Sequence, residues 1–198
     1  MGGTFNPPHI GHINAAKSAK RSLDLSELIL IPTAIPPHKE MAEDSANTDD
    51  RLHMTRLIAE LADAEVSDFE IVRGGRSYTV DTLTHFKEIY PEDELWLIMG
   101  TDMFLTLEEW REPERIFKLS NIAVVPRNSD DREKLLLHGE HLKNKYGATI
   151  RIIDVPAVTI SSSDIRPEPG QMAEYIPQSV LSYIKEKKLY GSEAAELD

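Results

Sequence analysis

The sequence contains no cysteine. This absence excludes disulfide bonds, thiolate nucleophiles, cysteine-ligated zinc and iron–sulfur clusters. Long hydrophobic runs are also missing: segments such as 28–31 and 95–99 are far too short to cross a bilayer, and no signal peptide is recognisable. Positive charge is scarce, because 22 Lys and Arg face 34 Asp and Glu, for a net charge of -12. We therefore expect a soluble, cytoplasmic protein that does not bind nucleic acid or membranes through general basic charge.

What is present is the composition of one globular domain, with 198 residues of which 40% are hydrophobic and 28% charged. Short apolar segments rich in β-branched residues predict buried strands at 28–31, 69–72, 95–98, 122–125 and 150–153. Apolar residues at helical spacing predict helices at 12–23, from a Thr48 cap onward, from near Asp81 to before Pro91, at 131–146 and at 177–188. This alternation predicts an α/β fold that is doubly wound, with a mostly parallel sheet and helices on both faces.

Ligands of such sheets bind beyond the carboxyl ends of the strands. The residues expected there include the glycine turn at the start of the chain, Gly100 with Asp102, and the stretch 156–166. Loops as long as 34–48 tend to be functional or mobile in compact domains.

The string 2–12, GGTFNPPHIGH, is the first candidate for chemistry. Glycines let the backbone approach a phosphate, and His12 would lie at the amino end of a helix, where free N–H groups favour an anion. His9 precedes it by three residues, which places both imidazoles on one side of a helical turn. The string is neither a Walker A loop nor a G-x-G-x-x-G fingerprint. The alternative is an ordinary turn with two surface histidines.

The string 160–166, ISSSDIR, is the second candidate. Serines at a helix start offer hydroxyl and backbone N–H donors to a phosphate, and Arg166 adds a permanently charged fork. The alternative is a helix cap followed by a surface arginine. Pro167, Pro169 and Gly170 follow, so we expect the helix to be short or loop-like.

Together the two strings resemble the G-G-[ST]-F-[DN]-P-x-H-x-G-H and I-S-S-x-x-I-R elements of the nucleotidyltransferase superfamily, which has a Rossmann-like fold. The resemblance implies a set of ATP-binding residues: Gly2, Gly3, Thr4, Phe5, His9, His12, Gly100, Asp102, Ile160, Ser161, Ser162 and Arg166.

Three further elements resemble the nicotinate-nucleotide adenylyltransferases within this superfamily: PPHK at 36–39, SYTVDTL at 77–83, and GTD at 100–102 with Trp110 eight residues on. The resemblance implies that the nicotinate ring stacks on Trp110, with Thr79 near its carboxylate and Ser77 and Tyr78 in the same site. Each residue also has a local alternative. Trp110 can pack over a neighbouring helix, Thr79 can cap one, and Lys39 can be a solvated loop lysine.

The implied reaction transfers the adenylyl group of ATP to nicotinate mononucleotide, giving deamido-NAD and pyrophosphate in NAD biosynthesis. The acceptor phosphate is already a nucleophile, so we assign the catalytic roles to charge neutralisation by His9, His12, Lys39 and Arg166. We expect Mg²⁺ as cofactor, held through phosphates and waters rather than by a protein metal site. The alternatives are phosphopantetheine adenylyltransferase, a cytidylyltransferase, or a nucleotide-binding module without turnover.

We expect a single domain over 1–190 and a frayed acidic tail at 191–198. The superfamily has a strand of several residues before the glycine turn, whereas this sequence has only Met1 there. We therefore expect a truncated first strand and weak stability. ATP and nicotinate mononucleotide are the expected partners, and the sequence leaves open whether the protein is a homo-oligomer.

Overall fold

The computed structural model describes residues 1–37, 41–126, 131–154 and 160–192. The strands are β1 (Gly2–Gly3), β2 (Ile29–Pro32), β3 (Glu65–Val66), β4 (Trp96–Gly100), β5 (Asn121–Val125) and β6 (Ile150–Ile152). The α-helices are α1 (Ile10–Ser22), α2 (Thr48–Ala62), α3 (Phe69–Arg73), α4 (Thr79–Ile89), α5 (Thr101–Leu105), α6 (Pro113–Leu119), α7 (Arg132–Tyr146), α8 (Ser162–Ile165) and α9 (Gln178–Glu186). The 3₁₀ turns among the described residues are η1 (Leu107–Glu109), η3 (Ala173–Tyr175) and η4 (Leu189–Gly191).

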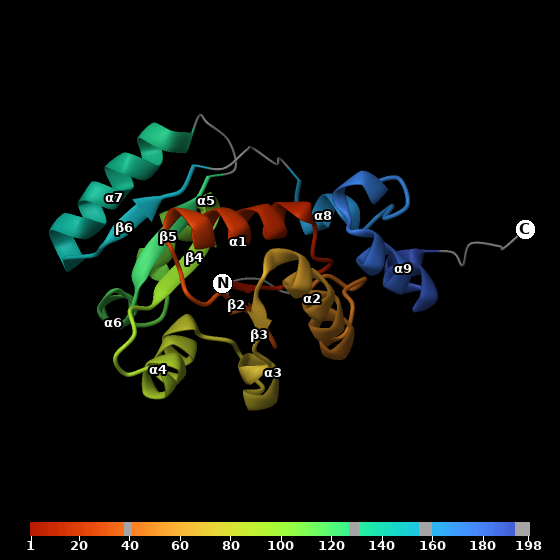
Figure 1. Ribbon diagram of the computed structural model, residues 1–198, viewed down its shortest axis with the longest axis horizontal. Coiled ribbons are helices and arrows are strands. Elements are labelled where there is room, and N and C mark those ends of the chain that lie inside the picture. Colours follow the sequence, from red (N-terminus) through yellow and green to blue (C-terminus); the bar gives the residue numbers. More distant parts are fainter. Residues whose placement is uncertain (38–40, 127–130, 155–159, 193–198) are drawn as a thin grey trace, which may run out of the picture.

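The strands form two parallel three-stranded sheets, ordered β1-β2-β3 and β4-β5-β6, which meet where β1 lies against β4 (Figure 1). In β1, Gly2 pairs with Ile31 and Gly3 with Pro32. The chain therefore winds outward in both directions from the β1–β4 junction, which confirms the doubly wound α/β prediction. The carboxyl ends of β1 and β4 mark the switch in strand order where such folds bind ligands.

Four of the five predicted strands are present, displaced by two residues at most at either end: 28–31, 95–98, 122–125 and 150–153 correspond to β2, β4, β5 and β6. The prediction for 69–72 is wrong, because this segment forms the helix α3. The hydroxyl of Ser67 accepts a hydrogen bond from the N–H of Phe69 at 3.3 Å, and Gly74 ends the helix with a φ of 70°. Val72 is 76% exposed, so this run does not have the burial of a central strand. The short strand β3 takes that place in the sheet.

The predicted helices are present, with one correction at a cap. Asn47, not Thr48, caps α2, and its side-chain oxygen accepts the N–H of Asp50 at 2.8 Å. Gly147 ends α7 in the left-handed conformation, as expected for a glycine after a helix. None of the helices in the described part of the chain is long and apolar enough to cross a membrane.

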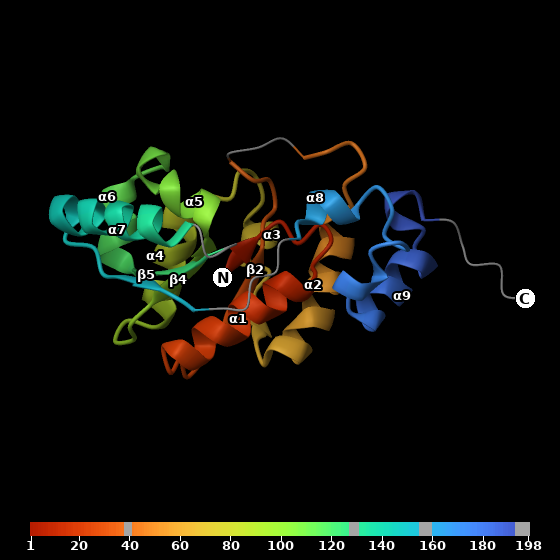
Figure 2. The same ribbon diagram turned by 90° about the horizontal axis from the view of Figure 1, so that it is seen from above.

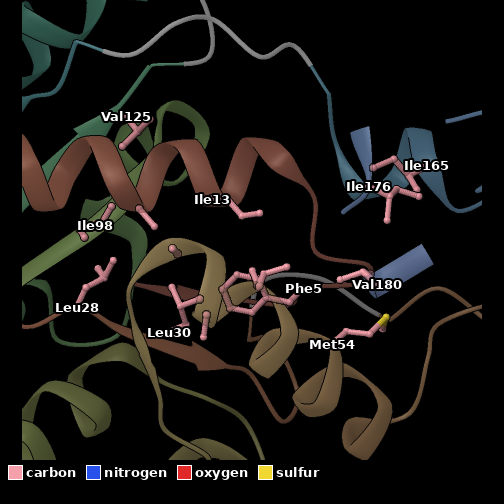
Figure 3. Packing of buried hydrophobic residues seen from close by; sticks show 14 of the residues in the cluster. Phe5, Ile13, Leu28, Leu30, Met54, Ile98, Val125, Ile165, Ile176 and Val180 are labelled. Carbon is pink, nitrogen blue, oxygen red and sulfur yellow. The ribbon is translucent and has the colours of Figure 1, made fainter. Parts of the chain in front are cut away.

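The helices cover both faces of the sheet, and the core lies on either side of it. Figure 2 shows α1 on one side of β4 and β5, with α6 and α7 on the other. One apolar cluster joins the sheet to α1, α2 and α9, and the other joins it to α4, α5, α6 and α7. Phe5 is 1% exposed and lies in the first cluster with Leu30 and Met54 (Figure 3). Its side chain anchors the turn that follows β1 to the core.

Glu70 of α3 is a buried acid that lies beside Thr82 of α4. It lines a cavity of about 400 Å³ between β2 and β4, and its Oε1 accepts the hydroxyl of Thr82 at 2.7 Å. Burial raises the pKa of Glu70 above its usual value. The cavity is also lined by Gly2 of β1 and by Thr79 of α4.

Candidate active site

The turn between β1 and α1 presents two histidines at the carboxyl end of β1. His9 is the N-cap residue of α1 and is 6% exposed, whereas His12 lies one turn further on and is partly exposed. Their ring centroids are 3.9 Å apart, and the ring of Phe5 lies 5.0 Å from that of His12. The structure thus brings both imidazoles to one side of the helix start, as predicted.

The helix cap fixes which nitrogen of His12 carries the proton. The backbone N–H of His9 donates to Nδ1 of His12 at 3.2 Å. A nitrogen that accepts a hydrogen bond has no proton, so the neutral ring carries its proton on Nε2. His12 is therefore held as an Nε2–H donor, which suits a phosphate oxygen.

The two sequence motifs lie in direct contact although more than 150 residues separate them. The hydroxyl of Ser162 donates to the carbonyl of Pro7 at 2.8 Å, and Nη1 of Arg166 donates to the carbonyl of Asn6 at 3.0 Å. Figure 1 shows α8 beside the start of α1. This contact places the serines, Arg166 and both histidines at one edge of the sheet.

The helix α8 is as short as the prolines after it predicted. Ser161 is its N-cap residue, and both its N–H and its hydroxyl donate to the carboxylate of Asp164, at 2.9 and 2.6 Å. The helix ends at Ile165, and the side chain of Arg166 remains only 15% exposed. The pose of Arg166 is therefore set by the first turn rather than by a continuing helix.

Asn6 organises the site, a role that sequence reasoning did not assign to it. Its Oδ1 accepts the N–H of Ala46 at 3.1 Å and the hydroxyl of Tyr190 at 2.8 Å, while its Nδ2 donates to Ser45 at 2.9 Å. Burial raises the pKa of Tyr190, so its hydroxyl stays protonated and remains a donor. Together with the Arg166 contact, this one residue joins the first turn to loop 34–48, α8 and η4.

Arg51 is a second organising residue that the sequence analysis missed. It is 1% exposed, and its guanidinium donates to the carbonyls of Thr4 at 2.9 Å and Ala34 at 3.1 Å. It therefore joins the loops that follow β1 and β2. A signal was available, because Arg51 occupies the helical register of the apolar residues Met54 and Ile58, where a solvated arginine is not expected.

Gly100 and Asp102 occupy the carboxyl end of β4, next to β1. Gly100 is the last residue of β4 and the N-cap residue of α5, and Asp102 is exposed in the first turn of that helix. A carboxylate here accompanies the free N–H groups of a helix start. The ribose contact that the family resemblance implies for Asp102 stays a prediction.

The predicted acceptor residues surround the start of α4. Tyr78 is the N-cap residue of α4 and Thr79 its first residue, whereas Ser77 is buried and its hydroxyl accepts the N–H of Ala34 at 3.0 Å. Ser77 thus holds the backbone after β2. The guanidinium of Arg111 lies 4.7 Å from the ring centre of Tyr78, so the segment with Trp110 meets the start of α4.

Glu108 fixes the segment before Trp110. It accepts hydrogen bonds from Lys145 at 2.8 Å and from Tyr146 at 3.0 Å, and lies 3.0 Å from His141. The bond from Lys145 contributes most to holding the pKa of Glu108 down, at about 2. This cluster fastens η1, and with it Trp110, to α7.

Two predicted site residues need separate comment. The side chain of Phe5 is buried in the core, so an ATP contact from Phe5 would come from its backbone. Lys39 lies outside the described residues. Among the described residues there is no group of three or more His, Cys, Asp or Glu side chains that could hold a metal ion.

Comparison with known proteins shows the family of this chain. The profile of the cytidylyltransferase-like family matches residues 1–168, which include both motifs. The chain therefore belongs to the cytidylyltransferase-like family. Its fold is similar to that of the Plasmodium falciparum nicotinic acid mononucleotide adenylyltransferase complexed with NaAD, with a TM-score of 0.78, 18% identity, and coverage of 97% of this chain and 96% of the other.

Sequence relatives place the chain more narrowly. It is 41% identical over 197 residues to a probable nicotinate-nucleotide adenylyltransferase of Desulfitobacterium hafniense, covering 96% of this chain and 93% of the relative. It is 38% identical over 208 residues to the protein of the same name from Citrifermentans bemidjiense, covering 96% of each. Within the family, the chain belongs with the nicotinate-nucleotide adenylyltransferases.

Proposed function

We propose that this protein transfers the adenylyl group of ATP to nicotinate mononucleotide, forming deamido-NAD and releasing pyrophosphate. The observation that carries this proposal is the direct contact of α8 with the first turn, made by Ser162 and Arg166. It assembles histidine, serine and arginine donors where β1 and β4 end. The curated relatives bear the name of this activity.

The donors act on the phosphates of ATP. A phosphate oxygen of the mononucleotide attacks the α-phosphorus in line, the bond from that phosphorus to the bridging oxygen breaks, and the electron pair leaves with pyrophosphate. His12 donates a hydrogen bond to a phosphate oxygen through Nε2. His9 and Arg166 contribute further hydrogen-bond donors or positive charge. Their role is to hold the reactants and to stabilise charge that develops on the phosphate oxygens.

The acceptor lies at the start of α4. Trp110 offers a flat indole face for the pyridine ring, and Thr79, in the first turn of α4, offers a hydroxyl and a backbone N–H to the pyridine carboxylate. Ser77 holds the neighbouring backbone by its bond to Ala34. The neutral amide of nicotinamide mononucleotide cannot replace the charge of the carboxylate, so we expect the acid to be preferred.

Lys39 and Mg²⁺ complete the proposal. Lys39, on the loop after β2, would add charge to the departing phosphates. The donors around the first turn are histidine, serine and arginine, which suit phosphate oxygens rather than Mg²⁺; the ion would take its ligands from phosphates and water. Bound in this way, the ion would supply positive charge to neutralise the phosphates.

The activity is tested by incubating the purified protein with ATP or CTP and a panel of acceptors, then measuring pyrophosphate and the dinucleotide product. We expect release with ATP and nicotinate mononucleotide, and much less with nicotinamide mononucleotide. Release with phosphopantetheine instead, a preference for CTP, or binding of ATP without turnover would each overturn the proposal.

The role of His12 is tested by replacing its ring. His12→Ala should lower kcat/KM by at least about a hundredfold, the effect of removing one donor to a developing oxyanion. His12→Gln retains an N–H donor and should lose less. His53→Ala is the matched control, because that histidine is exposed on α2 and its ring stacks on Tyr183, which the proposed site does not include. Equal activity of His12→Ala and wild type would contradict the assignment.

A further inference from the structure

Arg166 is engaged by a carboxylate from another part of the chain. Its Nε lies 3.3 Å from Oδ1 of Asp44, and its Nη1 and Nη2 donate to the carbonyl of Asn6 and the hydroxyl of Ser163. A guanidinium fork binds carboxylates and phosphates by the same geometry. In this structure, Asp44 thus takes one edge of the group that the proposed function aims at the phosphates of ATP.

Asp44 is brought to this position by its own neighbours rather than by chance. The next two residues, Ser45 and Ala46, are both hydrogen bonded to the side chain of Asn6, and the N–H of Ser45 donates to the carbonyl of Ala42 at 3.0 Å. Asn6 also accepts from Arg166 through its carbonyl. One residue therefore anchors both partners of the ion pair.

The two partners differ in how easily they can leave the pair. The side chain of Arg166 is 15% exposed and is fixed by two further hydrogen bonds, whereas that of Asp44 is 49% exposed. A half-exposed carboxylate regains its hydration by turning toward solvent, and such pairs contribute little stability. A buried arginine that lost its partner would have to find another anion.

We propose that Asp44 competes with the nucleotide phosphates for Arg166 and thereby sets the affinity of the site for ATP. In the free protein, the negative charge of the Asp44 carboxylate neutralises the positive charge of the Arg166 guanidinium. An incoming phosphate replaces Asp44 at Nε of Arg166. The side chain of Asp44 then rotates toward solvent, which removes a negative charge from beside the triphosphate. This inference rests on the proposed function, because it requires Arg166 to meet ATP.

The test compares Asp44→Asn, the conservative variant Asp44→Glu, and the control Glu43→Gln, whose side chain is an exposed acid in the same turn. Binding of a non-hydrolysable ATP analogue is measured by titration calorimetry, and KM and kcat by pyrophosphate release. Asp44→Asn should tighten analogue binding and lower the KM for ATP about two- to fivefold, with little change in kcat. Asp44→Glu and Glu43→Gln should resemble wild type.

A second pair of variants distinguishes whether Asp44 competes with ATP for Arg166 or instead supports Arg166. In an Arg166→Gln background, Asp44→Asn should leave analogue binding unchanged, because the carboxylate no longer has a cation to occupy. Weaker binding by Asp44→Asn alone would show that Asp44 supports Arg166, and unchanged binding would show that it does not compete; either result overturns the inference. If wild type binds no ATP analogue, the proposed function itself fails.

Discussion

The glycine turn that carries the site leaves no room for a side chain at Gly3. A Cβ at this position would lie 3.0, 3.1 and 3.3 Å from three ring atoms of Phe5. That ring is 1% exposed and enclosed by the core, so it has no open space to move into. At Gly2 the nearest atom to an added Cβ is the carbonyl oxygen of Ile31 at 4.0 Å, an ordinary contact. The two neighbouring glycines thus form a matched pair for substitution.

Gly3→Ala should destabilise the protein relative to Gly2→Ala by about 1–3 kcal/mol, the range for overpacking a core. Either substitution restricts the backbone of the unfolded chain and thereby adds about 0.4–1 kcal/mol to the free energy of unfolding. This contribution is the same in both variants and cancels in the comparison. For a domain of this size the melting temperatures should differ by about 2–12 °C. The assay is thermal and urea unfolding followed by circular dichroism.

The reasoning has a further check in the Phe5 ring. In a double-mutant cycle with Phe5→Leu, the penalty of Gly3→Ala should shrink, because the leucine lacks the ring atoms that the new methyl meets. Melting curves of Gly3→Ala and Gly2→Ala that coincide within about 1 °C would refute the claimed clash.

Two other substitutions test groups outside the turn between β1 and α1. Burial raises the pKa of Glu70 above its usual 4.5, so the wild type loses stability as pH rises above that value. Glu70→Gln, which can keep the bond from Thr82, should therefore melt higher than wild type at neutral pH, with the gap closing below pH 4.5; a constant gap would contradict this. Tyr190→Phe removes the 2.8 Å bond to Asn6 and should lower the free energy of unfolding by about 0.5–1.5 kcal/mol while raising the KM for ATP. An unchanged urea midpoint would argue against that bond.

The strands could be predicted from sequence where burial alone decides the structure. The segment 122–125 is apolar on every residue and forms β5, which is buried almost throughout. The segment 69–72 looks similar but forms a helix, because Ser67 and Gly74 supply local start and stop signals. Apolar content cannot distinguish a short helix from a strand when the flanking residues decide.

The residues of the candidate site likewise fall into those that the sequence could predict and those that it could not. The first turn and 160–166 are contiguous strings whose chemistry is local, so their residues could be chosen from the amino-acid order alone. Arg51 and Asn6 act through contacts with residues 17 to 184 positions away, and no short pattern contains both partners. The assignment of Lys39 stays a prediction, because it lies outside the described residues.

The bonds of Asn6 also order the events of folding. Asn6 is among the first residues to be synthesised. Its hydrogen-bond partners Arg166 and Tyr190 follow 160 and 184 residues later in the chain. Contacts of such long range close large loops and form slowly. The turn between β1 and α1 therefore gains its last partners only after nearly the whole domain has left the ribosome. A nascent chain with its first half folded would hold the histidines without their arginine, and would gain nucleotide affinity as one of its last steps.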